Sequence, residues 1–185
     1  MKVNENGVIN SKETVFNGAI FNVEKREVTN PEEDVLQREV VTKAPVVVMV
    51  VVNQDGEVAI TKEYRSGVNK VTCGLPAGII DEGEKPIEAA HREVKEEIGY
   101  EVKNSEFIGV VNSSEGFTNE VSHLFAVSVN SEGLAETSFD EGERIETMFL
   151  PFDYILAMIR DGEIQSAQCI SALLMFKLRI DWRWD

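Results

Sequence analysis

The aliphatic run VVVMVVV, from Val46 to Val52, limits the folds open to this chain more than any other feature of the sequence. Apolar residues that follow one another without alternation predict a strand that is buried on both of its faces. The run is far too short to cross a bilayer as a helix. It therefore predicts a strand inside a sheet and gives no sign of a membrane segment.

Strands are predicted on both sides of this run. Short β-prone segments before residue 30 are broken by Asn17-Gly18, which predicts a hairpin. The order of elements along the chain is β-rich, helix, β-rich, helices, which predicts the α/β (α+β) class: a mixed sheet with helices packed on its faces. Further strands are expected over 35–42, 57–64, 106–111, 122–129 and 144–151, and closing helices near 152–160 and 166–180.

From Pro86 the hydrophobic period changes to that of a helix. Ile87, Ala90, Val94 and Ile98 fall on one stripe at helical spacing. Pro86 suits the first turn of this helix, and Gly99 suits the position just past its end.

Charge and composition exclude several functions. The chain of 185 residues has 33 acidic and 18 basic side chains, a net charge of −15, which argues against nucleic acid and anionic membranes as partners. Cys73 and Cys169 form no CxxC pair, so neither a disulfide framework nor a zinc site is expected. With no apolar stretch typical of a signal peptide at its start, the chain is expected to be cytoplasmic.

Three carboxylates crowd the last turns of the predicted helix: Glu93, Glu96 and Glu97. Like charges three or four residues apart destabilise a helix, and acids near its C-terminus also oppose the helix dipole. A cation is therefore expected to offset their charge.

The spacing around these acids resembles the box of the Nudix hydrolases. That pattern is G-x5-E-x7-R-E-U-x-E-E-x-G-U, with U aliphatic, and only Tyr100 departs from it. An ordinary helix with a solvated acidic face is the alternative, and the complete spacing makes it the weaker interpretation. The matching residues are Gly78, Glu84, Arg92, Glu93, Glu96, Glu97 and Gly99.

The resemblance implies a Nudix fold and a metal-dependent hydrolase. Two or three Mg²⁺ or Mn²⁺ ions are implied, since hard cations prefer oxygen ligands. Arg92 is assigned to the catalytic set as an orienting ion-pair partner, with Glu84 as its candidate partner and a surface helix pair as the alternative. Two further residues complete the implied catalytic set: Glu96, and Glu141 as the candidate general base. The implied metal ligands are Glu93, Glu96, Glu97, Glu143 and the Ala77 carbonyl.

The flanking segments LPAGIIDEGE and EYRSG resemble the ADP-ribose pyrophosphatases and related nucleoside-diphosphate-sugar hydrolases. The implied reaction splits the diphosphate of a small nucleotide substrate into a nucleoside monophosphate and a sugar phosphate. Glu115 stands where that group usually has Pro, which leaves another sugar nucleotide open. The implied substrate-binding residues are Arg38, Glu39, Arg65 and Phe21, with a core aromatic as the alternative for Phe21.

The strands before Val46 exceed a minimal catalytic core. Residues 1–45 are therefore expected to form a β-rich extension that joins two subunits in a homodimer, and residues 46–185 to form the Nudix domain. Two alternatives stay open: hydrolysis of dinucleoside polyphosphates or nucleoside triphosphates, and a module that binds nucleotides without turnover. The intact set of acids favours the enzyme.

Overall fold

The computed structural model describes residues 6–130, 137–139 and 144–180. The chain divides into two compact units, which are described separately below. No helix in the described parts of the chain is long and apolar enough to cross a membrane. Unit 1 comprises residues 1–44 and 112–121, and unit 2 comprises residues 45–111 and 122–185.

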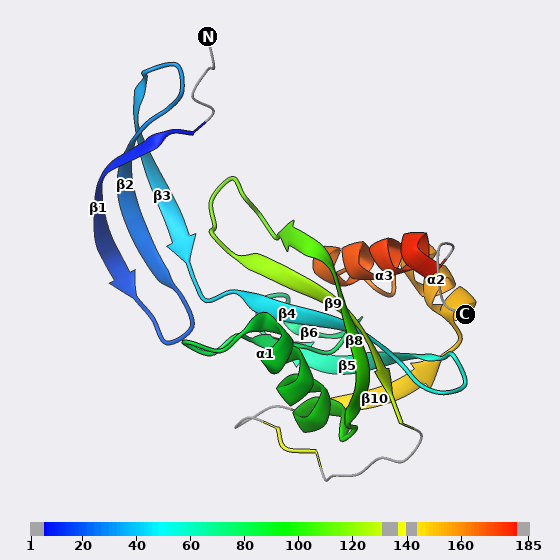
Figure 1. Cartoon of the computed structure of the whole chain (residues 1–185). Helices are drawn as coiled ribbons and strands as arrows, with labels where there is room; N and C mark the ends of the chain where they lie inside the picture. The colour runs from blue at the N-terminus through cyan, green and yellow to red at the C-terminus, as the bar shows by residue number, and fades with distance from the viewer. Residues whose placement is uncertain (1–5, 131–136, 140–143, 181–185) are drawn as a thin grey trace. The chain divides into compact units, whose positions relative to one another are not determined.

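Unit 1 is built on a three-stranded antiparallel sheet in the order β1-β2-β3 (Figure 1). The predicted hairpin is present, with a loop in which the Gly18 N–H donates to the Phe21 carbonyl at 3.0 Å. None of the described residues of this unit is buried. Its strands are β1 (Val8–Asn17), β2 (Asn22–Thr29) and β3 (Val35–Thr42).

Unit 2 contains a seven-stranded mixed sheet in the order β10-β5-β4-β9-β8, with β6 paired to β5 and β7 paired to β4. β4 and β9 run parallel, whereas the pairs of β5 with β6 and with β10 are antiparallel. β6 and β7, which are short and contain glycine, were not predicted from the sequence. The strands are β4 (Val46–Val52), β5 (Val58–Arg65), β6 (Lys70–Gly74), β7 (Ala77–Ile79), β8 (Val102–Asn112), β9 (Val121–Val129) and β10 (Ile145–Leu150).

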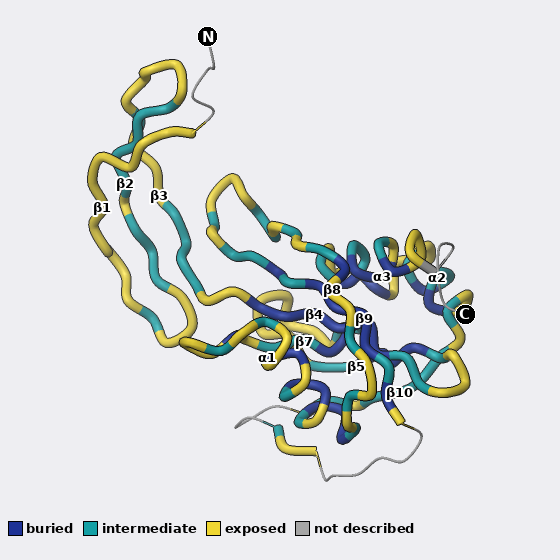
Figure 2. Tube along the Cα trace, viewed as in Figure 1, coloured by how far each residue is buried: buried dark blue, intermediate teal, exposed yellow. Residues whose placement is uncertain are grey.

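The aliphatic strand β4 is buried on both faces, as predicted (Figure 2). Val48 and Val50 belong to the core shared with α2 and α3, and Val47, Met49 and Val51 to the core shared with α1. Alternate side chains of a strand point to opposite faces, so the sheet lies between two helical layers. The helices are α1 (Pro86–Glu93), α2 (Phe152–Arg160) and α3 (Ala167–Ile180).

The helix that carries the acids is less regular than predicted. α1 ends at Glu93 and continues as a π-helical turn, η1 (Val94–Ile98), before Gly99 adopts the left-handed conformation with φ 74°. Turns of this kind are rare and frequently lie at functional sites. The predicted stripe holds for Ala90, Val94 and Ile98, which are buried, but Ile87 in the first turn is exposed.

Candidate active site

Gly78 and Glu93 meet at the centre of the site. β7 carries Gly78, and the last residue of α1 is Glu93. A Cβ atom at position 78 would lie only 1.9 Å from Cδ and Oε1 of Glu93, so the carboxylate packs directly against the glycine backbone. A side chain of any size at this position would displace the carboxylate.

Glu97 reaches the same strand from the π-helical turn. Its Oε2 accepts a hydrogen bond from the Ala77 N–H at 3.2 Å. Glu93 and Glu97 are 9% and 8% exposed, and a buried carboxylate is costly unless it has partners. The fold therefore holds two buried acids against the backbone of β7.

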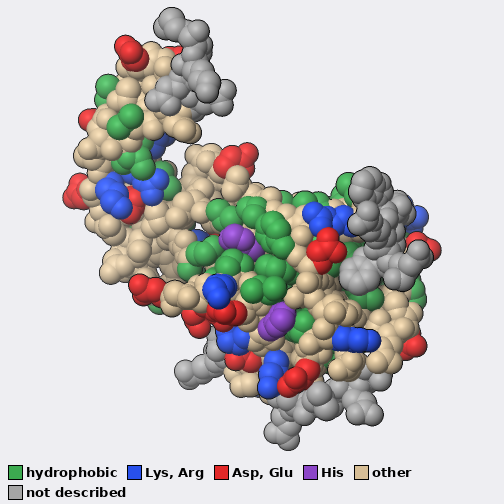
Figure 3. Space-filling view, viewed as in Figure 1, with side chains coloured by type: hydrophobic (Ala, Val, Ile, Leu, Met, Phe, Trp, Pro, Cys, Tyr) green, Lys and Arg blue, Asp and Glu red, His purple; other side chains and the backbone are tan. Residues whose placement is uncertain are grey.

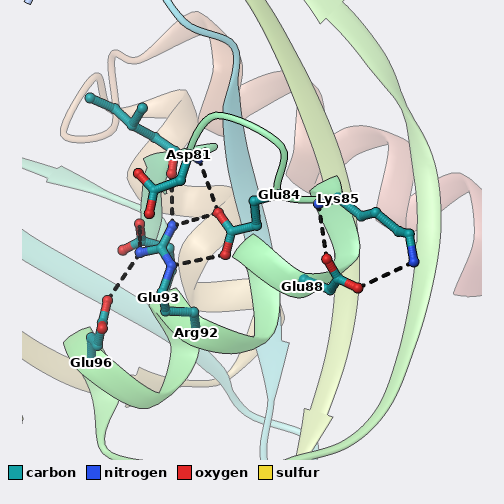
Figure 4. Close-up of polar contacts among 8 residues, drawn as sticks. Asp81, Glu84, Lys85, Glu88, Arg92, Glu93 and Glu96 are labelled. Atoms are coloured by element: carbon teal, nitrogen blue, oxygen red, sulfur yellow. Dashed lines mark hydrogen bonds and ion pairs between the residues drawn. The ribbon is translucent and has the colours of Figure 1, made fainter.

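Arg92 links the acids of the site (Figure 4). Its Nε and Nη2 donate to the two carboxylate oxygens of Glu84 at 3.0 and 2.9 Å, the bidentate geometry that arginine favours. Its Nη1 donates to Glu93 Oε1 at 2.7 Å and to Glu96 Oε2 at 3.1 Å. A further bond from Nη2 to the Ile79 carbonyl, at 2.9 Å, ties the guanidinium to β7.

The pairing of Arg92 with Glu84, which the sequence suggested, is present. The hydrogen bond from Arg92 lowers the pKa of Glu84 despite the opposing effect of burial. The pKa of Arg92 is in turn raised above its already high ordinary value, most by the hydrogen bond to Glu84 and less by Glu93 and Glu96. Glu84 Oε2 also accepts from the Asp81 N–H at 3.0 Å, so it braces the loop between β7 and α1.

The donors gathered here suit a hard divalent cation. They are the carboxylates of Glu93, Glu96 and Glu97, and carboxylate oxygens are ligands that Mg²⁺ and Mn²⁺ prefer. Within residues 6–130, 137–139 and 144–180, no three His, Cys, Asp or Glu side chains converge closely enough to hold a metal. In this structure the cation that bridges Glu93 and Glu96 is the Arg92 guanidinium.

The other predicted site residues are distributed over both units. In unit 2, Arg65 at the end of β5 is exposed and forms an ion pair with Glu63 at 2.6 Å. Glu141 and Glu143 lie outside the described residues. Shortly before them along the chain, the Ser138 N–H donates to the Glu96 carbonyl at 2.9 Å.

Unit 1 carries the remaining predicted residues. Arg38 and Glu39 are neighbours on β3, opposite Arg26 and Lys25 of β2, so their side chains point to opposite faces of that sheet. Phe21 lies in the hairpin loop, where its ring centroid is 5.6 Å from that of Phe16. It is exposed, so the alternative of a core aromatic is wrong.

The segment around Glu115 is fastened to the end of β3 within unit 1. The Val41 N–H donates to the Phe117 carbonyl at 2.8 Å, and the Asn119 N–H donates to the Val41 carbonyl at 3.2 Å. Glu120 accepts from Lys43 Nζ at 2.6 Å and from Ser113 Oγ at 2.6 Å. This cluster was not predicted from the sequence, because no local pattern connects residues so far apart.

Comparisons with known proteins agree with this fold. The family model of the NUDIX domain matches residues 42–173. An ADP-ribose pyrophosphatase of Bacillus subtilis (strain 168) is 27% identical over 169 residues, 91% of each chain. A methanol dehydrogenase activator of Bacillus methanolicus is 26% identical over 167 residues, 90% of each chain. The crystal structure of an ADP compounds hydrolase aligns with a TM-score of 0.84 and 22% identity over 98% of this chain and 97% of that one, which confirms the predicted fold.

Proposed function

This chain belongs to the Nudix family of hydrolases, and from that premise we propose that it splits the diphosphate bond of ADP-ribose or a related nucleoside diphosphate sugar. The products would be a nucleoside monophosphate and a sugar phosphate. The observation that carries the proposal is the folded box itself, in which Glu93 and Glu97 are held against Gly78 and Ala77. The relative named as an ADP-ribose pyrophosphatase supports the choice of substrate.

Two or three Mg²⁺ or Mn²⁺ ions are the proposed cofactors. The residues that would hold them are Glu93, Glu96, Glu97, Glu143 and the Ala77 carbonyl oxygen. Bound divalent cations would neutralise charge on the diphosphate and activate water for attack on phosphorus. The buried carboxylates, the bare Gly78 backbone and the chemistry of these donors fit that role.

Residues of the chain itself would orient the metal ligands and accept the proton of the attacking water. Until a cation binds, Arg92, braced by Glu84, holds the carboxylates of Glu93 and Glu96 in place. Glu141 is the proposed general base for the attacking water. The backbone bond between Ser138 and Glu96 supports this choice, because it ties the segment that precedes Glu141 to the box helix.

Substrate binding is proposed for Arg38, Glu39 and Phe21 of unit 1 and for Arg65 of unit 2. We further propose that residues 1–45 join two copies of the chain in a homodimer. Three strands need a covered hydrophobic face for stability, yet unit 1 has no buried residue among those described. Ile20 and Val35 are 71% and 62% exposed, and hydrophobic side chains are visible on the surface of this sheet (Figure 3).

A substrate panel tests the proposed activity. The purified chain would be given ADP-ribose, other nucleoside diphosphate sugars, dinucleoside polyphosphates and nucleoside triphosphates, each with Mg²⁺, with Mn²⁺ and with EDTA. We expect a nucleoside monophosphate and a sugar phosphate from the first two classes, abolished by EDTA and restored by either cation. Full turnover in EDTA would contradict the metal dependence, and preference for either of the last two classes would replace the proposed substrate.

A further inference from the structure

Arg92 forms ion pairs with two of the residues proposed as metal ligands. Its Nη1 lies 2.7 Å from Glu93 Oε1 and 3.1 Å from Glu96 Oε2. The rest of its guanidinium faces Glu84, which is not among the proposed ligands. Arg92 thus contacts two proposed metal ligands, Glu93 and Glu96, and one acid, Glu84, that is not proposed to bind metal.

We propose that Arg92 is an internal counter-ion that competes with the divalent cation for Glu93 and Glu96, and that Glu84 retains Arg92 when the cation binds. This inference rests on the metal dependence proposed above. It extends the bracing of Arg92 by Glu84, described above, to the moment at which a cation displaces Nη1.

Competition follows from charge and distance. A cation bound to Glu93 Oε1 would lie close to Nη1, which donates to that oxygen at 2.7 Å. Two positive charges at such a separation repel, and partial burial of Arg92 and Glu93 limits screening by solvent. Binding of the cation must therefore weaken or break the contacts made by Nη1.

Glu84 allows a cation to replace Nη1 at Glu93 and Glu96 while the Arg92 side chain stays in the site. Its two bonds use Nε and Nη2, so they can persist when Nη1 leaves Glu93 and Glu96. Glu84 is itself held by the Asp81 N–H, and the Ile79 carbonyl accepts a further bond from Nη2. The guanidinium therefore has an anchor that is independent of the proposed metal ligands.

The arrangement also explains how the protein stays folded without the cation. Glu93 is buried, and a buried carboxylate without a positive partner is strongly destabilising. Arg92 supplies that partner when the divalent cation is absent. The consequence is a lower apparent affinity for the cation, because part of its binding free energy is spent on displacing Nη1.

Binding of Mn²⁺ to the full chain tests the proposal without measuring activity. Free Mn²⁺ would be followed by electron paramagnetic resonance for the wild type, Arg92→Gln, Arg92→Lys and Glu84→Gln. Arg160→Gln is the matched control, because Arg160 is an exposed arginine whose ion pair within the described residues is with exposed Asp161. Melting temperatures with and without Mn²⁺ would be recorded for the same variants.

Substitutions of Arg92 and of Glu84 should change the affinity for Mn²⁺ in opposite directions. We expect Arg92→Gln to bind Mn²⁺ about tenfold more tightly or better, to melt at a lower temperature without the ion, and to gain more from Mn²⁺ than the wild type. Glu84→Gln should bind Mn²⁺ more weakly, because Arg92 then loses its charged anchor, keeps only the Ile79 carbonyl outside the proposed ligands, and pairs more firmly with Glu93 and Glu96. Arg92→Lys keeps the charge but has one nitrogen in place of the guanidinium, so it cannot stay on Glu84 while it releases Glu93 and Glu96. It should therefore bind Mn²⁺ no more tightly than the wild type, and Arg160→Gln should bind it as the wild type does.

If Arg92 had only a structural role, the Mn²⁺ affinities of the variants would differ from these expectations. Unchanged or weaker Mn²⁺ binding by Arg92→Gln would overturn the competition and leave the proposed function standing. If Arg92→Gln does not fold, Glu84→Gln decides alone, and unchanged affinity in that variant would overturn it. Absence of Mn²⁺ binding by the folded wild type would remove the metal dependence and this inference together.

Discussion

At Gly78 the absence of a side chain leaves room for the Glu93 carboxylate. We predict that Gly78→Ala lowers turnover by at least about 10²-fold, because the added Cβ would meet that carboxylate at 1.9 Å and displacements of about 1 Å can have such effects. Gly67→Ala is the control, since a Cβ there would meet nothing within 4 Å. Steady-state kinetics and thermal melts of both variants decide, and near-normal turnover of folded Gly78→Ala would contradict the packing.

A second residue-scale prediction separates the proposed base from the proposed ligands. Glu141→Gln should lower kcat by roughly 10²- to 10⁴-fold, the usual contribution of a general base, with little change in KM. Glu97→Gln should lose affinity for Mg²⁺ and turnover together. Kinetics with Mg²⁺ titrated would be measured for Glu141→Gln, Glu143→Gln and Asp140→Asn. Near-normal kcat for Glu141→Gln, with kcat lost in Glu143→Gln at saturating Mg²⁺, would transfer the role of base to Glu143.

At the scale of elements, the ion pair between Glu120 and Lys43 adds to the backbone hydrogen bonds that attach the segment 113–120 to the end of β3. Burial raises the pKa of Glu120, but the Lys43 ammonium and the Ser113 hydroxyl outweigh it, and the net pKa lies below the ordinary 4.5. A carboxyl whose pKa is depressed by folding stabilises the fold above its unfolded pKa and loses that contribution as pH falls through the folded value. The attachment should therefore hold at neutral pH and weaken below about pH 4.5.

We predict that Glu120→Gln lowers the opening free energy of this segment by ~1–2 kcal/mol at pH 7, because the charge-assisted bonds are lost. Hydrogen exchange of the peptide that spans 113–120 would measure the change. The difference from wild type should shrink as pH falls below 4.5. Exposed Glu115 offers a control in the same segment, and a Glu115→Gln effect as large as that of Glu120→Gln would argue against the ion pair.

At the scale of the whole molecule, the sheet of unit 1 bears on the proposed homodimer. We predict that the intact chain sediments at twice its 20.7 kDa mass, and that deletion of residues 1–42 gives a monomer with little activity. The physical reason is that β1 to β3 have no buried residue in the described chain, so their apolar side chains gain most from a second copy. Sedimentation of an active monomeric wild type would remove the proposed dimer.

Local patterns in the sequence predicted much of this protein. The aliphatic run identified a strand buried on both faces, because alternate side chains of any strand face opposite layers. The spacing from Gly78 to Gly99 identified the box and its family, because it places the acids on neighbouring turns of one helix. Both features depend only on residues that are close in sequence.

Contacts between distant residues were decided only by the tertiary structure. The sequence did not reveal the bond from Ala77 to Glu97, the pairing of β7 with β4, or the attachment of Glu120 to Lys43. The π-helical turn was likewise missed, because a regular helix satisfies the same apolar stripe. Such features depend on which surfaces pack together, and a pattern local to one segment carries no information about its distant partner.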